Sequence, residues 1–132
     1  RHCIIPARAI WEPDWRSGRA VPTRITQAHG RALGAAGLWS RWQDTQGQVL
    51  YSFTLLTINA DAHPFMRQFH KPDDEKRMIV VLPPEDYQAW LQADAAESMA
   101  LLRAQPQDEW QGMAAAPEPA VPAAPRDLFG AP

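Results

Sequence analysis

The sequence predicts an α+β fold, an antiparallel sheet flanked by helices. Four strand-like segments joined by short turns occupy the first 58 residues, and turns this short connect antiparallel neighbours. An apolar stripe at helical spacing then runs from Tyr87 to Leu102. The 132 residues include 45% hydrophobic and 21% charged residues, so the chain suits one domain with its own core.

The four strands are expected at residues 3–11, 21–27, 32–42 and 49–58. Pro6 interrupts the first strand and cannot donate to a sheet ladder, which places it at an edge or a bulge. The third strand is rich in glycine and alanine, so another backbone or a ligand can approach it closely. The fourth strand is mostly apolar on both faces, and this pattern indicates a central position.

The second half predicts a short helix, a loop, a strand and a long helix. Asp61 is expected to cap the short helix, which ends at His70 and is followed by the charged loop 71–76. A short buried strand is expected at 77–82. The long helix begins with a proline and acidic residues suited to its dipole, and it spans residues 84–103.

The two ends of the chain differ from its middle. The chain begins at Arg1 and runs at once into a strand pattern, which indicates that a portion of the protein lies upstream. Residues 1–113 are expected to form the C-terminal portion of a domain. Twelve of the nineteen residues in 114–132 are alanine or proline, a composition typical of an extended or disordered tail.

Charge is distributed unevenly along the chain. Residues 1–60 carry seven arginines against three acids, a balance of +4, and the remainder carries six bases against twelve acids, a balance of −6. This asymmetry points weakly to an anionic partner for one side of the molecule. Solvated arginines at strand edges account for it equally well.

Cysteine and histidine usage narrows the chemistry. Cys3 is the only cysteine, so no internal disulfide can form, which suits a reducing cytoplasm. It lies in an apolar strand pattern and is expected to be a small buried hydrophobe. His2 with Cys3, His29, His63 and His70 lack the spacing of metal ligands, so no metal is expected. The sequence has no glycine-rich phosphate loop, and no cofactor is expected. No apolar run approaches membrane-spanning length, and no signal-peptide pattern is present.

Glu12 and His70 are the candidate acid and base. His70 stands where the short helix ends, beside Arg67 and Lys71, and a titratable ring near basic groups suits proton transfer close to an anion. Glu12 stands at the end of a predicted strand. The six tryptophans could stack on nucleobases, although tryptophans more often pack in the core and at its rim.

Four stretches resemble, in order, the motifs of one known family. HCIIPARAIWE at 2–12 resembles its RCLIPADGFYEW, and PTRI at 22–25 stands where it has a P-Y-F-I strand. AGLWSRW at 36–42 resembles its AGLWE-x-W. Between 54 and 91, TLLTINA, FH, RMIVVL and PEDYQAWL follow its T-I-L-T-T-x-A, I-H-D-R-M-P-V-I-L and P-E-x-x-x-x-W-L. The chain thus resembles the SOS-response-associated peptidase (SRAP) family of abasic-site processing proteins.

The resemblance implies a barrel-like antiparallel sheet and a cytoplasmic, nucleoid-associated, monomeric protein that binds single-stranded DNA. In the family an N-terminal cysteine reacts with the ring-opened aldehyde of an abasic site and forms a thiazolidine crosslink. The family's glutamate and histidine fall on Glu12 and His70, which would move protons during imine formation and ring opening. The motif arginine falls on Arg77, and Arg77 and Arg67 are expected to bind phosphate.

The chain departs from the family pattern in several places. The N-terminal M-C-G-R and N-A-R segments are not in this sequence, and Cys3 corresponds to the cysteine of R-C-L-I-P-A, so this chain alone should not form the crosslink. KPDDE is inserted between His70 and Arg77, and Pro13 replaces the tryptophan after the glutamate. Two alternatives therefore stay open: a peptidase that acts on proteins, and a module that binds DNA or a partner without chemistry.

Overall fold

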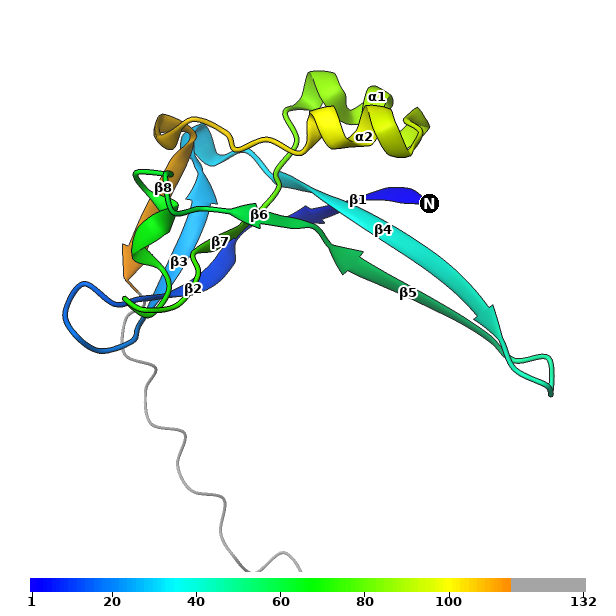
Figure 1. The fold of residues 1–132 in the computed structure, drawn as a ribbon, viewed down its shortest axis with the longest axis horizontal. Coiled ribbons are helices and arrows are strands. Elements are labelled where there is room, and N and C mark those ends of the chain that lie inside the picture. Colours follow the sequence, from blue (N-terminus) through cyan, green and yellow to red (C-terminus); the bar gives the residue numbers. More distant parts are fainter. Residues whose placement is uncertain (115–132) are drawn as a thin grey trace, which may run out of the picture.

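The computed structural model describes residues 1–114, in which eight strands form three antiparallel sheets (Figure 1). The first sheet has the order β1 (His2–Ala7), β4 (Leu33–Gln43), β5 (Val49–Leu55). The second has the order β2 (Ile10–Asp14), β3 (Val21–Gln27), β8 (Trp110–Ala114). The third pairs β6 (Thr57–Asn59) with β7 (Arg77–Ile79).

Two α-helices and four short 3-10 turns complete the described part of the chain. The helices are α1 (Tyr87–Gln92) and α2 (Ala95–Leu101), which lie together at the β1 end of the first sheet (Figure 1). The 3-10 turns are η1 (Ala28–Gly30), η2 (Met66–Gln68), η3 (Pro84–Asp86) and η4 (Gln107–Glu109). The predicted α+β class with antiparallel sheets is confirmed, although the sheets of residues 1–114 do not close into a barrel.

The strands expected at 21–27 and 32–42 are confirmed within one residue. The single strand expected at 3–11 was wrong, because the chain turns at Arg8 and Ala9 and changes sheet. β1 pairs with β4, whereas β2 pairs with β3, so the apolar run serves two sheets. Pro6 lies in β1, at the edge of its sheet, as its missing N–H requires.

The expectation that residues 49–58 form one central strand was also wrong. The segment divides into β5 and β6 at Leu56, and β5 is an edge strand paired only with β4 among the described residues. All of β5 is exposed, and Tyr51 and Phe53 are 64% and 66% exposed. An apolar pattern shows which side chains of a strand could be buried, but they are buried only where another segment of the chain covers them. β4 and β5 extend from the body as a long ribbon (Figure 1).

A closed set of three backbone hydrogen bonds joins the first and third sheets. Ala36 N–H donates to the Val80 carbonyl over 2.8 Å, Val80 N–H to the Leu56 carbonyl over 2.9 Å, and Leu56 N–H to the Ala36 carbonyl over 2.9 Å. Ala36 and Val80 are fully buried. Buried backbone groups need hydrogen-bond partners, and each of these three residues donates to one of the other two and accepts from the remaining one. We call this set the Ala36–Leu56–Val80 junction.

Two hydrophobic clusters lie on either side of the junction. One fills the space between β3, the η2 turn and β7, and the other lies between β1, β4 and the helices. The first comprises Ile25, Leu33, Ala60, Met66, Phe69, Met78, Val81 and Trp110. The second comprises Ala36, Val80, Leu82 and Trp90. The strand expected at 77–82 therefore continues, after β7, as buried chain that links the two clusters.

The long helix expected at 84–103 is interrupted. Ala93 has φ −60° and ψ 144°, an extended conformation that ends α1. Asp94 then begins α2 with a capping box: its carboxylate accepts from the N–H groups of Ala96 and Glu97, and the Glu97 carboxylate accepts from Asp94 N–H. These reciprocal bonds satisfy amides at the start of α2 that have no partner within the helix. The apolar stripe expected on one long helix is therefore divided between two helices.

Ala114, the first residue of the predicted tail 114–132, belongs to a strand. Ala114 is the last residue of β8 and lies opposite Thr23 of β3. The remaining residues, 115–132, lie outside the described part of the chain. No helix within residues 1–114 is both long enough and apolar enough to cross a membrane.

The small residues of β4 allow close packing, as the sequence predicted. A Cβ atom placed on Gly37 would lie 2.1 Å from Ile5 Cδ1 and 2.7 Å from the Thr54 carbonyl oxygen. Both contacts are shorter than van der Waals distance, and the carbonyl belongs to the β4–β5 ladder and cannot move freely. Gly37 thus lets β1 and β5 pack tightly on the two sides of β4.

Replacement of Gly37 by alanine should lower the free energy of unfolding by about 1–3 kcal/mol, because the added methyl group overpacks the sheet. Urea denaturation of both proteins measures the difference. Ser40→Ala, at an exposed position of the same strand, is the matched control and should change stability by less than about 0.5 kcal/mol. Equal stability of Gly37→Ala and the wild type would contradict this account of β4.

Candidate functional site

Glu12 lies on the inner face of the second sheet. It pairs with Thr23 of β3, so their side chains share one face, and Thr23 and Ile25 of that face are buried. Asp14, two residues along β2, lies on the same face with only 13% of its side chain exposed. The alternation of β2 thus directs two carboxylates toward the interior side of the sheet.

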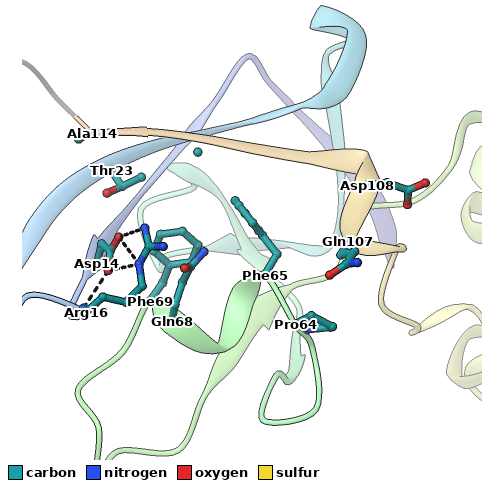
Figure 2. Close-up of a pocket in the computed structure, with 11 residues that line it drawn as sticks. Asp14, Arg16, Thr23, Pro64, Phe65, Gln68, Phe69, Gln107, Asp108 and Ala114 are labelled. Atoms are coloured by element: carbon teal, nitrogen blue, oxygen red, sulfur yellow. Dashed lines mark hydrogen bonds and ion pairs between the residues drawn. The ribbon is translucent and has the colours of Figure 1, made fainter.

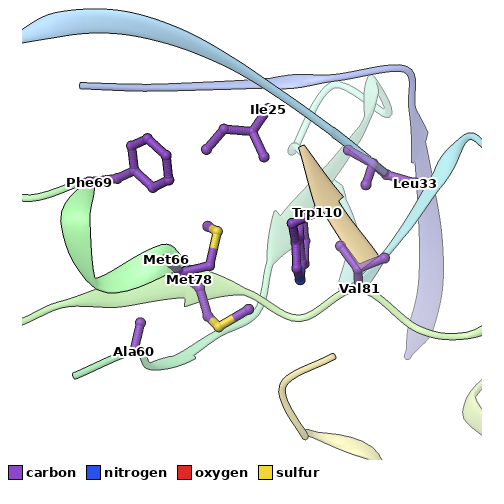
Figure 3. Packing of buried hydrophobic residues seen from close by; sticks show 8 residues of the cluster. All are labelled: Ile25, Leu33, Ala60, Met66, Phe69, Met78, Val81 and Trp110. Carbon is purple, nitrogen blue, oxygen red and sulfur yellow. The ribbon is translucent and has the colours of Figure 1, made fainter. Parts of the chain in front are cut away.

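The loop that carries His70 is held against the end of β2. Trp15 N–H donates to the Gln68 carbonyl over 3.3 Å, and the Lys71 ammonium lies 5.7 Å from the centre of the Trp15 ring. Met66 and Phe69, on either side of that carbonyl, are buried in the first core cluster (Figure 3). The loop directly before His70 is therefore anchored both by its buried side chains in the core and by its contacts with Trp15.

Glu12 and His70 interact electrostatically. Burial of the half-buried Glu12 carboxyl raises its pKa above the usual value, and the positive charge of His70 partly opposes this rise. A carboxyl whose pKa is raised by desolvation is closer to the working range of a general acid or base. The structure thus brings together the two residues that the sequence singled out, from segments 58 positions apart.

His70 has an unsatisfied nitrogen. Its Nδ1 atom is buried and has no hydrogen-bond partner among the described residues. A buried polar atom without a partner costs about 1–3 kcal/mol, and such atoms in folded proteins call for an explanation. A group that His70 meets only when a substrate is bound would supply one.

His63 holds the loop before His70 in place, a structural role that the sequence did not reveal. Its Nδ1 atom accepts hydrogen bonds from the N–H groups of Phe65, at 3.2 Å, and Met66, at 3.1 Å. The neutral ring must therefore carry its proton on Nε2, which donates to the Gln105 carbonyl over 2.8 Å. This buried imidazole fixes the start of the η2 turn and ties it to the segment before β8.

The expectation that Asp61 caps a helix ending at His70 was wrong. The helix is only the 3-10 turn η2, and His63 performs the capping. Asp61 instead accepts from the Asn59 side chain over 2.9 Å and from Lys76 N–H over 3.3 Å, and the Asn59 bond lowers its pKa. It therefore closes the base of the loop 71–76 rather than starting a helix.

A cleft of about 570 Å³ includes Thr23, the cross-strand partner of Glu12, and Phe69, the residue before His70, in its walls (Figure 2). Neither Glu12 nor His70 lines it. Asp14 and Arg16 form its charged side, and Phe65, Phe69 and Gln68 belong to the facing loop. The Arg16 guanidinium donates to both Asp14 oxygens, at 2.6–3.1 Å, and these bonds lower the pKa of Asp14. Asp14 therefore stays ionised while Glu12, on the same face, is shifted toward the neutral form.

The two arginines expected to bind phosphate differ in the structure. Arg77 is engaged: its guanidinium donates to the Thr57 hydroxyl and carbonyl at 2.8–3.1 Å and to Glu75 at 2.9 Å. Arg67 is exposed at the η2 turn, and its side chain makes no hydrogen bond or ion pair among the described residues. Arg67 is the one of the two with its full donor set available.

Cys3 is a free, half-buried residue of β1, opposite Gly37. Its carbonyl accepts from the indole N–H of the buried Trp90 over 2.9 Å, which joins β1 to α1. Within residues 1–114, no three histidine, cysteine, aspartate or glutamate side chains gather as metal ligands would.

Comparison with known proteins identifies what this chain is similar to. The model of the SOS response associated peptidase (SRAP) family matches residues 1–118. The abasic site processing protein YoaM of Bacillus subtilis is 32% identical over 94 residues, which cover 69% of this chain and 37% of that protein. YoqW of Bacillus phage SPbeta, another abasic site processing protein, is 30% identical over 94 residues, which cover 69% of this chain and 38% of its own. The chain spans less than two fifths of these relatives.

Solved structures agree with the fold. A crystal structure of a protein from Bordetella bronchiseptica superposes with a TM-score of 0.82 at 50% identity and covers 87% of this chain and 55% of its own. A crystal structure from Bacteroides thetaiotaomicron gives a TM-score of 0.72 at 21% identity, covers 86% of this chain and 49% of its own, and supports the fold alone.

Glu12→Gln should stabilise the protein near neutral pH. Because burial raises the pKa of Glu12, the native state binds its proton more tightly than the unfolded state, so stability falls as pH rises through the raised pKa. Glutamine avoids this cost. Urea denaturation should show the gain at about pH 7 and none below about pH 4, where the carboxyl is protonated in both states. Glu85→Gln, at an exposed position, is the control and should show no gain. A less stable Glu12→Gln protein at neutral pH would contradict the raised pKa.

His63→Ala should lower the free energy of unfolding by about 2–4 kcal/mol, because two amides and a carbonyl lose a buried partner. His63→Asn should recover part of this loss, since an asparagine oxygen can accept from the Phe65 and Met66 amides as a capping residue does. Chemical denaturation of the three proteins tests the order wild type, Asn, Ala. Equal losses for Ala and Asn would show that the capping bonds are not what His63 contributes.

Proposed function

Because the chain belongs to the SOS response associated peptidase (SRAP) family, we propose that the protein containing it processes abasic sites in single-stranded DNA by forming a covalent protein–DNA link. The similar proteins YoaM and YoqW are named abasic site processing proteins. The observation that carries the proposal to this chain is the proximity of His70 to Glu12, which brings an imidazole with an unsatisfied nitrogen near a carboxyl of raised pKa.

The proposed chemistry needs proton transfers at two steps. The closed sugar of an abasic site opens when the bond between its anomeric carbon and its ring oxygen breaks. The ring oxygen gains a proton, with His70 as the donor in this scheme, and the anomeric hydroxyl releases its proton to water as the aldehyde forms. The aldehyde then condenses with an N-terminal amine, loses water and forms an imine, to which the neighbouring thiol adds to give a thiazolidine. Glu12 carries protons between the amine and the departing water. The cysteine that provides the amine and the thiol is supplied from outside residues 1–132.

Phosphate contacts next to the site are assigned to Arg67. Its guanidinium is exposed beside the loop that ends at His70, and it makes no ion pair among residues 1–114. Arg77 can bind a DNA phosphate only if the phosphate replaces Glu75 as an acceptor of the Arg77 guanidinium or accepts beside Glu75. A guanidinium already held by Thr57 is also well oriented for a phosphate, since its rotamer is fixed before binding.

Glu12→Gln should slow crosslinking to single-stranded DNA with one abasic site by about a hundredfold, the usual contribution of a positioned acid or base. His70→Asn should slow it comparably. The full gene product that contains this chain is incubated with labelled oligonucleotide, and the covalent product is separated on a denaturing gel. Glu85→Gln removes one carboxylate elsewhere and should react at the wild-type rate. Unchanged kinetics for Glu12→Gln would remove it from the mechanism.

Two other outcomes correspond to different functions. DNA that is retained on a native gel without any covalent product would indicate a binding module that lacks the reaction, consistent with Pro13 after Glu12 in place of tryptophan. Cleavage of an unrelated polypeptide that depends on Glu12 or His70 would indicate a peptidase acting on proteins. Either result would replace the proposed crosslinking activity.

A further inference from the structure

A second cleft, of about 560 Å³, is lined by three arginines. Arg24 comes from the middle of β3, Arg8 from the turn between β1 and β2, and Arg31 from the residue after η1. The remaining walls are neutral: Thr26, Gln27 and Gln111, with backbone at Gly30 and Ala32. Arginines from three separated segments thus converge on one hollow that offers further hydrogen-bond donors and acceptors.

The charge of this cleft is mostly uncompensated. No aspartate or glutamate lines it. Arg31 forms an ion pair with Glu109, which lies outside the cleft walls, whereas neither Arg8 nor Arg24 forms an ion pair within residues 1–114. Like charges that converge without an acid repel one another, and an anion between them relieves the repulsion.

The arginine cleft lies on the opposite side of the second sheet from Glu12. Successive residues of a strand point to opposite faces, and Thr23 and Ile25 are buried on the inner face, so Arg24 between them points outward. Thr26 and Gln111, which are paired in the ladder, share this outer face. The cleft is therefore separate from the Glu12–His70 site and from the cleft beside it.

Two exposed apolar side chains, one of them an indole, adjoin the arginines. Trp11 and Met113 are the cross-strand partners of Arg24 on the two sides of β3, so the three side chains form one row on the outer face. Trp11 is 58% exposed and Met113 is 72% exposed. An exposed indole beside guanidinium groups is the arrangement with which proteins bind single strands, by stacking a base and holding its phosphates.

We propose that Arg8, Arg24 and Arg31 form a phosphodiester-binding site on the outer face of β2–β3–β8, with Trp11 as the stacking surface for a base of the same single strand. The choice of DNA as the anion rests on the proposed function. The guanidinium fork suits phosphate oxygens, and the exposed indole favours a nucleic acid over an acidic peptide. This outer site holds strand that flanks the abasic nucleotide and lies beyond reach of Glu12 and His70.

Binding of DNA without abasic sites tests the outer site apart from any chemistry. Fluorescence anisotropy of the full gene product is measured with labelled single strands of about 16 nucleotides and about 4 nucleotides, across salt concentrations. The double variant Arg8→Ala/Arg24→Ala should bind the long strand about tenfold or more weakly. The slope of log affinity against log salt should fall by about 1.4, or 0.7 for each lost phosphate contact.

Trp11→Ala separates stacking from charge. It should weaken binding of the long strand about five- to a hundredfold and leave the salt slope unchanged, because stacking releases no counterions. The double variant Arg19→Ala/Arg41→Ala is the matched control: it removes the same charge from two exposed arginines outside the cleft and should retain wild-type affinity. Equal losses in both double variants would overturn the proposal, because they would show a general effect of net charge.

The two proposals fail in different ways. The outer site alone would be overturned if the wild-type protein crosslinks abasic DNA and the Arg8→Ala/Arg24→Ala variant binds the long strand as tightly as the wild type does. A protein that never crosslinks, yet loses affinity and salt slope in that variant, would support the outer site and overturn the proposed crosslinking. Loss of affinity for the short strand as great as for the long one would also count against a separate flanking site.

Discussion

The Ala36–Leu56–Val80 junction is the constraint on which the rest of the structure depends. Its three backbone hydrogen bonds are 2.8–2.9 Å long, and Ala36 and Val80 are fully buried, so a shift of one segment leaves a backbone group of another without a partner. The small side chain of Ala36 allows the three segments to meet. By fixing the chain after β5 and before α1, the junction sets where the loop between β6 and β7 begins and ends.

That loop is what brings His70 to Glu12. It leaves the junction, turns at η2 under the control of His63, and buries Phe69 before His70 meets the inner face of β2. The site therefore combines a strand residue from one sheet with a loop residue held by another. Sites built on anchored elements keep their geometry, and here the anchor is the first core cluster.

The site also lowers the stability of the folded protein. Glu12 is held in surroundings that disfavour its charge, and His70 keeps a buried nitrogen without a partner. A fold selected for stability alone would remove both features, so their presence together on one face distinguishes this region from Asp14, whose charge Arg16 compensates. On the outer face of the same sheet the charged groups are instead exposed: the arginines of the cleft face solvent, where an anionic partner can reach them.

The sequence by itself determined the α+β class, the strands β3 and β4, the close packing at Gly37 and the choice of Glu12 and His70, because periodicity and residue chemistry are local properties or were carried by short motifs. It misplaced β5, merged β1 with β2, joined α1 to α2 and assigned a cap to Asp61 in place of His63. The errors at β1, β2 and β5 concern which distant segment pairs with a strand or covers its apolar face, whereas the break between α1 and α2 and the cap by His63 depend on local hydrogen bonds. Only the tertiary structure decides the strand pairings, because their free energy comes from partners remote in sequence. The meeting of Glu12 with His70, and of Arg8 with Arg24 and Arg31, is of that kind.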